Sequence, residues 1–379
     1  MTDAVLIYAD SMRSAEQRHE VPVAVPDEFL YASTNGRRFV VVTSFELDRI
    51  READGGLEVL PLEEFGWDEM IRQGLTRAEM ELEHVRRACE RFGIRAATVP
   101  PEFPVELADF LRGHGIDVTP DRQHFVQRRR VKNRAELEGI RRAQRAAEAG
   151  MRAGAELLRR AEVDRDRVLL DGQPLTCERL KVAVEAAFSE EGVAADEFIV
   201  SHGAQTAVGH EMGSGAIAAS EPIVFDLFPR DRVSGCFADM TRTFVVGEPP
   251  AELEEYQRLC REALERALPL IKPGTKGRDI YAATCDFFHE HGYPTQLSKK
   301  DGEVLDRGFY HGLGHGIGLE VHEEPWIGRY PGELLAGDVL AIEPGLYRPG
   351  FGGCRLEDLV HVTDDGGEVL TTYPYDLSP

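Results

Sequence analysis

The spacing of hydrophobic residues divides the chain into two regions. In the first, residues 4–9 and 38–44 are apolar runs that predict strands, and residues 70–94 carry apolar positions at helical spacing and predict one long helix. A further strand and helix are expected at residues 95–101 and 104–115. Residues 1–128 are therefore expected to form a small α/β domain.

The second region starts with helices and ends with strands. A helical pattern runs from Asn133 to about Ala161, and a second helix follows it. After residue 195 short strands and glycine-rich turns predominate, interrupted by helical patterns at 251–271 and 277–292. Without a regular alternation of strands and helices, residues 129–379 are expected to form an α+β domain.

Composition narrows the classes of protein. The chain has no apolar run near twenty residues, so no membrane-spanning helix is expected. Its net charge of −23 disfavours nucleic acid and anionic membranes as partners. The first residues do not resemble a signal peptide, and the six cysteines form no CxxC pair, so we expect a cytoplasmic protein with buried thiols.

Two segments of the second region, 223–246 and 340–362, share one pattern. Each is an apolar strand that ends in an acid, followed by a turn and a second strand that carries another acid. As hairpins, they would place Asp226 opposite or near Asp239, and Glu343 opposite or near Glu357. Buried carboxylates need a positive partner. Arg242 and Arg355 leave a structural ion-pair network open, but a metal explains four converging acids better.

Three histidines lie in HGLGHGIGLEVHEEP, residues 311–325, where glycine alternates with larger residues. A period of two predicts a strand, and so many glycines disfavour a helix. On a strand, His311 and His315 would lie roughly 13 Å apart at about 3.3 Å per residue, too far to bind one ion. We expect one of them to be a metal ligand and the other to face the substrate.

Four carboxylates and one imidazole describe an oxygen-rich site with room for two divalent metals. Such donors suit manganese, cobalt, iron or zinc better than calcium or copper. Two metals can activate a shared water and hold a carbonyl oxygen for attack.

These motifs resemble the dinuclear-metal peptidases of the pita-bread fold. GHGIGLEVHEEP, IEPGLY, GCRLEDLV and DMTRTF are most similar to the prolidase and aminopeptidase P branch, and the preceding α/β domain is similar to the extra domain of that branch. The resemblance covers nearly the whole chain, strongly after residue 130. It implies an α+β pita-bread catalytic domain behind a smaller creatinase-like α/β domain.

The resemblance also implies roles for individual residues. The metal ligands would be Asp226, Asp239, His315, Glu343 and Glu357. A hydroxide bridging two metal ions would attack the scissile carbonyl, with Glu343 moving protons. The other catalytic and substrate-binding residues would be His210, His311 and His322, while Arg355 and Thr241 would contact and orient the ligands.

The chain departs from the family pattern at two places. Asp226 and Asp239 are thirteen residues apart, whereas the family usually has eleven. An even insertion in a hairpin keeps facing side chains in register, so we expect the ligands to be preserved. The second departure is Cys354, close to Glu357, which we expect to be a small residue packed in the hairpin. His202, His289, His291 and His361 are expected to have structural roles.

The resemblance implies an enzyme that cleaves Xaa-Pro bonds, with two divalent ions per chain, manganese foremost. The compact chain favours an Xaa-Pro dipeptidase (prolidase) that acts on proline-containing dipeptides. Aminopeptidase P activity on longer peptides is the alternative, and a non-catalytic peptide-binding or partner-binding relative is a remote one. A creatinase-like hydrolase lacks the metal ligands that this chain retains. In this branch the N-terminal domain of a partner can close the cleft, so a homodimer is expected.

Overall fold

The computed structural model describes residues 4–379. Contacts within the chain divide it into two compact units. The first comprises the described part of Met1–Arg129 together with Val233–Gly235, and the second comprises Arg130–Arg232 and Cys236–Pro379.

The first unit is built on a six-stranded sheet in the order β4-β3-β2-β1-β5-β6. Strand β2 is antiparallel to both of its neighbours, and the other pairs are parallel. The strands are β1 (Ala4–Ala9), β2 (Phe29–Thr34), β3 (Arg37–Val42), β4 (Glu58–Pro61), β5 (Ala96–Val99) and β6 (Asp117–Pro120).

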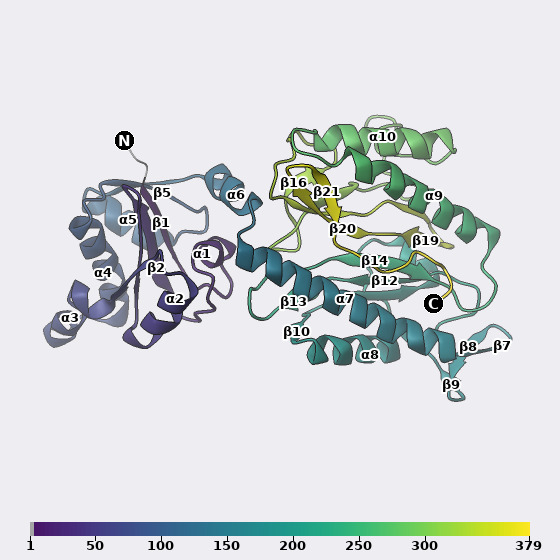
Figure 1. The fold of residues 1–379 in the computed structure, drawn as a ribbon, viewed down its shortest axis with the longest axis horizontal. Coiled ribbons are helices and arrows are strands. Elements are labelled where there is room, and N and C mark those ends of the chain that lie inside the picture. The colour runs from purple at the N-terminus through teal and green to yellow at the C-terminus, as the bar shows by residue number, and fades with distance from the viewer. Residues whose placement is uncertain (1–3) are drawn as a thin grey trace. The chain divides into compact units, whose positions relative to one another are not determined.

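Helices cover both faces of this sheet (Figure 1). The helices are α1 (Ala15–Glu20), α2 (Leu47–Ala53), α3 (Trp67–Gln73), α4 (Arg77–Arg91), α5 (Val105–Gly113) and α6 (Arg122–Arg130), with short 3-10 turns η1 (Ser44–Glu46) and η2 (Leu62–Phe65). The single helix expected at residues 70–94 is wrong. Gly74, at φ 79°, ends α3, and Thr76 begins α4 with a reciprocal capping box to Glu79. Because the apolar periodicity continues across the break, the pattern alone did not indicate that one helix ends at Gly74 and another begins after Thr76.

The second unit begins with α7 (Arg134–Arg160) and α8 (Cys177–Glu190). The predicted start of α7 is confirmed, because the Asn133 side chain accepts a hydrogen bond from the Glu136 N–H. These helices share a core with a sheet of order β11-β12-β14. The strands and turns of this half are β7 (Glu162–Asp164), β8 (Arg167–Leu170), β9 (Gln173–Pro174), β10 (Val193–Ala194), β11 (Ile199–His202), η3 (Gly203–Ala207), β12 (Ile223–Leu227), β13 (Arg230–Asp231) and β14 (Met240–Phe244).

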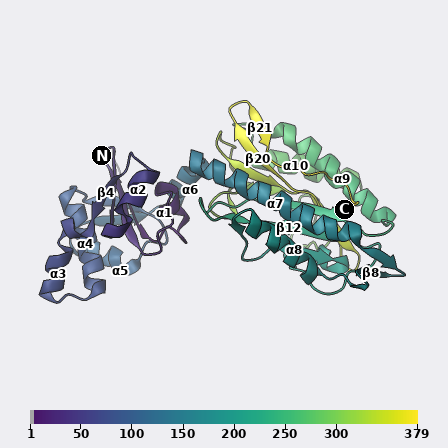
Figure 2. The same ribbon diagram turned by 60° about the horizontal axis from the view of Figure 1, so that its bottom comes forward.

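The rest of the second unit has its own core, in which α9 (Ala251–Ala267) and α10 (Gly277–Glu290) pack on a five-stranded sheet. In both views most strands of this unit lie between the pair α7 and α8 and the pair α9 and α10 (Figures 1 and 2), whereas β7, β8 and β9 lie beyond the end of α7. The sheet order is β16-β15-β17-β20-β21. The remaining elements are η4 (Leu268–Leu270), β15 (Gly314–Gly316), β16 (Glu323–Ile327), β17 (Val339–Ile342), β18 (Gly345–Arg348), β19 (Gly352–Arg355), β20 (Asp358–Thr363) and β21 (Gly366–Val369).

Within residues 4–379, no helix combines the length and the apolar character that crossing a bilayer requires. The six cysteines are buried free thiols. Cys354 lies on β19 inside the core of α9 and α10, where its thiol is 3.0 Å from the side-chain oxygen of Gln257.

Candidate metal centre

The first acidic hairpin is formed by β12 and β14. Asp226 pairs with Thr241 in its register, and Asp239 directly precedes β14. Because side chains alternate along a strand, Asp239 lies on the same face as Thr241 and therefore diagonally across from Asp226. The same register continues to the bridge between Arg230 and Phe237. The two extra residues between Asp226 and Asp239 therefore lengthen the tip of the hairpin, beyond the acids.

The second acidic hairpin contains Glu343 and Glu357. Ile342 pairs with Asp358 on β17 and β20, and Gly345 pairs with Arg355 on β18 and β19. Both pairings belong to one register, which places Glu343 across from Glu357. The Glu357 N–H donates to the Thr241 carbonyl at 3.1 Å and so joins the two hairpins.

His315 is presented by β15, which is much shorter than the strand expected from the alternating pattern and whose register with β16 shifts between Gly314 and Gly316. It lies between β16 and β17. A Cβ at Gly314 would lie 1.9 Å from the Ala341 carbonyl oxygen, and one at Gly316 would lie 2.3 Å from the Glu324 carbonyl oxygen. Glycine at these two positions therefore lets the neighbouring backbones approach closely while His315 faces the acids.

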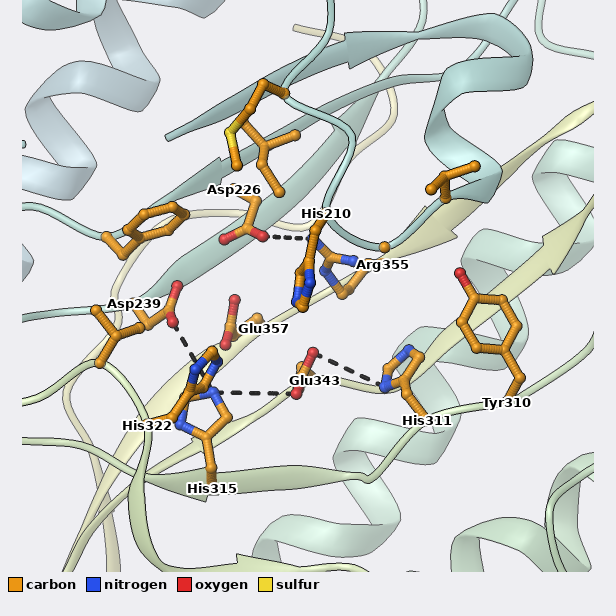
Figure 3. Close-up of a pocket in the computed structure, with 16 residues that line it drawn as sticks. His210, Asp226, Asp239, Tyr310, His311, His315, His322, Glu343, Arg355 and Glu357 are labelled. Atoms are coloured by element: carbon orange, nitrogen blue, oxygen red, sulfur yellow. Dashed lines mark hydrogen bonds and ion pairs between the residues drawn. The ribbon is translucent and has the colours of Figure 1, made fainter. Parts of the chain in front are cut away.

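Three of the expected ligands form a compact cluster. Asp239, His315 and Glu357 are buried, and one donor atom from each lies within 4.8 Å of the others. The His315 Nε2 is 3.9 Å from Asp239 Oδ2 and 4.0 Å from Glu343 Oε1 (Figure 3). Its Nδ1–H donates to the Gly316 carbonyl at 3.0 Å. The Nε2 lone pair therefore faces the carboxylates.

Arg355 and Thr241 hold two of these acids in place. The Arg355 guanidinium donates to Asp226 through Nη2, and its Nε donates to the Thr241 hydroxyl at 3.3 Å. The Thr241 hydroxyl in turn donates to Glu357 Oε2 at 2.7 Å. Arg242 points away from this network, because it lies on the other face of β14 and forms an ion pair with Asp358 at 2.8 Å. The arginines therefore do not neutralise the whole acidic cluster.

Burial and mutual repulsion perturb the acids. Burial raises the pKa of Asp239 and of Glu357 well above their usual values, and the neighbouring carboxylates raise both further. Burial raises the pKa of Glu343 to about 7. The Asp239 Oδ1 is a buried oxygen without a hydrogen-bond partner among the described residues. An orphaned oxygen beside several carboxylates suits a divalent cation.

The two histidines nearest the acids are poised as neutral groups. Burial lowers the pKa of His315 to about 4 and that of His311 to about 3. A neutral imidazole keeps a lone pair that can bind a metal ion. The donor set therefore fits the divalent metal that the sequence pattern predicts.

The acids lie in a cavity of about 570 Å³, which His210, His311 and His322 also line. Figure 3 shows His210 reaching over the carboxylates and His322 next to His315; the ring centroids of the latter pair are 4.4 Å apart. The His311 Nδ1–H donates to the Gly312 carbonyl at 2.7 Å, so its Nε2 accepts from the Tyr347 hydroxyl at 2.9 Å. All three histidines reach the same space as the acids.

Two tyrosines of the site were missed from the sequence. Tyr347 donates to His311 and accepts a hydrogen bond from Arg355 at 3.2 Å, and Tyr310 lines the cavity while its hydroxyl donates to the Ala207 carbonyl. Tyr347 is four residues after Glu343, so the period-two rule could have placed both on one face. No comparable signal marks Tyr310.

The four histidines that were expected to have structural roles interact with residues outside this cavity or lie at a helix end. His202 interacts with Glu221, and His361 with Glu368. His291 bonds the Phe287 carbonyl at the end of α10, and His289 lies in the last turn of that helix.

The chain belongs to metallopeptidase family M24, because the sequence pattern of that family matches residues 138–364. This family implies divalent metal ions, in agreement with the cluster described above. The family resemblance drawn from the motifs is thereby confirmed.

Two groups of relatives are similar to the chain in sequence. An Xaa-Pro dipeptidase of Pyrococcus furiosus is 39% identical over 135 residues, which cover 35% of each chain. An uncharacterized peptidase of Staphylococcus aureus is 34% identical over 248 residues, which cover 65% of this chain and 64% of the relative. The matched segments thus span less than two thirds of these relatives.

Solved structures match almost the entire chain. An Xaa-Pro dipeptidase from Bacillus anthracis has a TM-score of 0.78 at 22% identity, with 99% of this chain and 94% of that chain covered. An X-Pro aminopeptidase from Thermotoga maritima has a TM-score of 0.79 at 24% identity, with 99% and 97% covered. At these identities the similarity establishes the fold, so the predicted α+β pita-bread architecture is confirmed.

Proposed function

We propose that this chain is a two-metal exopeptidase that hydrolyses the peptide bond before proline, and that its preferred substrates are Xaa-Pro dipeptides. The observation that carries the proposal is the convergence of four carboxylates and a neutral histidine in one cavity, where one oxygen of Asp239 has no hydrogen-bond partner within residues 4–379. The name of the Pyrococcus furiosus relative supports the proline specificity.

Five residues would hold the metals: Asp226, Asp239, His315, Glu343 and Glu357. Asp239 and Glu357 belong to the compact cluster with His315, and each would be a ligand of both ions. Bound divalent ions lower the pKa of water and polarise a carbonyl group, which is the chemistry that amide hydrolysis requires. We propose manganese, with cobalt, zinc and iron as alternatives, since carboxylate-rich sites suit these ions.

The chain's own residues would handle protons and orient the substrate. Glu343, which lies close to both His311 and His315, would accept a proton and release it again during hydrolysis. His322 and His210, which line the same cavity, would donate hydrogen bonds to the substrate carbonyl. His311, held by Tyr347, would face the proline side. Arg355 and Thr241 would position Asp226 and Glu357.

The cavity walls are suited to a small apolar substrate. Ile199, Val208, Phe228 and Val321 line it together with Tyr310. Its volume of about 570 Å³ is within the range of small-molecule sites. We further propose a cytoplasmic homodimer with functional domains at 1–128 and 129–379, in which the first domain of a partner limits substrate length.

The test is a matched pair of substrates, one Xaa-Pro dipeptide and the same sequence extended by two residues. A chelator first removes metal ions from the protein, which is then loaded with manganese, cobalt or zinc in turn. Cleavage of the dipeptide alone is expected. Release of the first residue from the longer peptide would instead assign aminopeptidase P activity, and turnover of neither by the metal-loaded chain would contradict the proposal.

A further inference from the structure

A second cavity lies within the first unit. It has a volume of about 390 Å³ and opens at the edge where β1, β3 and β4 end. Tyr8 is near the end of β1, Val42 ends β3, and Leu62 follows β4. The carboxyl ends of neighbouring parallel strands are a common place for ligands in α/β sheets.

One buried polar group faces this cavity without a partner. His84, on α4, lines the cavity and is 2% exposed, and its Nε2 has no hydrogen-bond partner among the described residues. Its Nδ1 is 3.1 Å from the Met80 carbonyl, which can only accept, so Nδ1 carries the proton. The Nε2 is therefore a buried acceptor that an N–H or O–H donor would satisfy.

Aromatic rings surround this acceptor. The ring centroid of His84 lies 5.9 Å from the ring centroid of Tyr8 and 5.8 Å from that of Trp67. Phe29 and Phe45 also line the cavity. Aromatic faces attract the apolar body of a ligand and, through the ring quadrupole, a positive charge.

The charged lining is mainly negative. Asp27, Glu28 and Glu81 are present beside a single guanidinium, that of Arg77, whose Nε donates to Glu81 at 2.7 Å. Three carboxylates against one guanidinium disfavour an anionic ligand. Burial lowers the pKa of His84 to about 4, so this residue adds no positive charge near neutral pH.

We propose that this cavity binds a small organic cation, an ammonium group on an apolar body, with an ammonium N–H donated to His84 Nε2. The acidic residues would supply the electrostatic attraction, and Tyr8, Trp67 and Phe29 would enclose the apolar part. The site is separate from the metal cluster and does not depend on the activity proposed above.

The experiment uses the full metal-loaded chain with 5-fluorotryptophan in place of its two tryptophans. Trp67 borders the proposed site, and Trp326 lies 6.4 Å, ring to ring, from His315 of the metal cluster, so each resonance reports on a different region. Trp326→Phe assigns the two signals. Phenethylammonium is the probe, and phenylacetate is its anionic counterpart. Phenethylammonium is expected to shift the Trp67 resonance saturably, whereas phenylacetate leaves it unchanged.

Substitutions show which residues contribute to the affinity for phenethylammonium. His84→Phe keeps an aromatic ring but removes the acceptor and should weaken binding of phenethylammonium at least tenfold. The matched control is His114→Phe, because His114 also bonds the carbonyl four residues before it but is exposed outside the cavity. It should bind as the wild type does.

Glu28→Gln, at an exposed position of the rim, provides a variant that does not disturb the interior. It should weaken binding of the cation severalfold. An unresponsive Trp67 resonance, equal binding of phenylacetate, or undiminished binding by both His84→Phe and Glu28→Gln would overturn the proposal.

Discussion

At the scale of single residues, the metal cluster is a set of groups that are unfavourable without a cation. Asp239 and Glu357 are nearly fully buried, and burial together with repulsion from the neighbouring carboxylates raises the pKa of both. Removing carboxylates from water costs several kcal/mol per charge unless a counter-charge is present. Arg355 meets this need for Asp226. The negative charges of the other acids are the ones that a divalent ion would stabilise most.

The role proposed for Glu343 can be separated from its role as a ligand. Glu343→Gln keeps the shape and one oxygen donor but cannot exchange a proton. We expect the rate of Xaa-Pro hydrolysis to fall by about 10²–10⁴-fold, the usual contribution of a general acid–base group. Metal content, measured on the same sample, should be partly retained. Wild-type turnover in this variant would show that Glu343 does not move protons.

The raised pKa values also predict how pH affects the stability of the protein after a chelator has removed its metal ions, here called the chelated chain. Protonated carboxyl groups are favoured in the folded state, since Glu343 has a pKa of about 7 against an ordinary value of 4.5. The folded chain therefore binds more protons than the unfolded chain in this window, and its stability is lost as pH rises through about 7. The melting temperature of the chelated chain should fall from pH 6.5 to pH 8, since His311 and His315, whose pKa values burial lowers, have the opposite effect only below this interval.

Glu357→Gln is the matched control for that titration, because it removes one of the repelling carboxylates. Its chelated form should lose less stability over the same pH interval than the chelated wild type. Equal slopes for the two proteins would mean that repulsion within the cluster does not shape the stability profile.

Much of the site at this scale could be predicted from sequence, because the acids and histidines lie in short motifs with strand periodicity. Glu343 and Glu357 fall across from each other as expected. Asp226 and Asp239 are offset, since the register of the hairpin is fixed by its turn rather than by the acids. Tyr310 escaped notice because its place in the cavity depends on a distant contact with Ala207.

At the scale of elements, close packing positions the strand that carries Asp226. Helix α7 packs against β12, and Gly154 is one of the residues at this contact. A Cβ at Gly154 would lie 2.3 Å from the ring of Phe225, the residue before Asp226. A small residue in the middle of this helix thus allows the ligand strand to pack against it.

Gly154→Ala tests this contact. In an exposed helix the change would stabilise the protein by about 1 kcal/mol. Here overpacking should reverse the sign and cost about 1–3 kcal/mol. Gly113→Ala in α5 is the control, since nothing lies within 4 Å of the added methyl group. Chemical unfolding should show a loss for Gly154→Ala only; a gain in both would contradict the packing argument.

Elements were predictable where capping and periodicity agree. The start of α7 is marked by Asn133 and Glu136, and the sequence shows both. By contrast, the break between α3 and α4 depends on a left-handed Gly74 inside a continuous apolar pattern. The short length of β15 could not be predicted, because the alternation of glycine with larger residues continues beyond Gly316.

At the scale of the whole molecule, the family assignment rests on the second unit, where residues 138–364 match family M24. The matched structures, however, extend over 99% of the chain and so include the first unit. The fold class could be predicted because the motifs occur in the family's order along the sequence. The cavity around His84 could not, since its lining residues come from several separate segments.

The most direct measurement of the central claim is the metal content per chain by elemental analysis. It compares the wild type with Asp226→Asn, Glu357→Ala and Glu368→Ala, the last being an exposed acid on β21. Two divalent ions per chain are expected in the wild type and in Glu368→Ala, and at most one in each of the other two variants. Two ions in all four proteins would contradict the assignment of these acids as metal ligands.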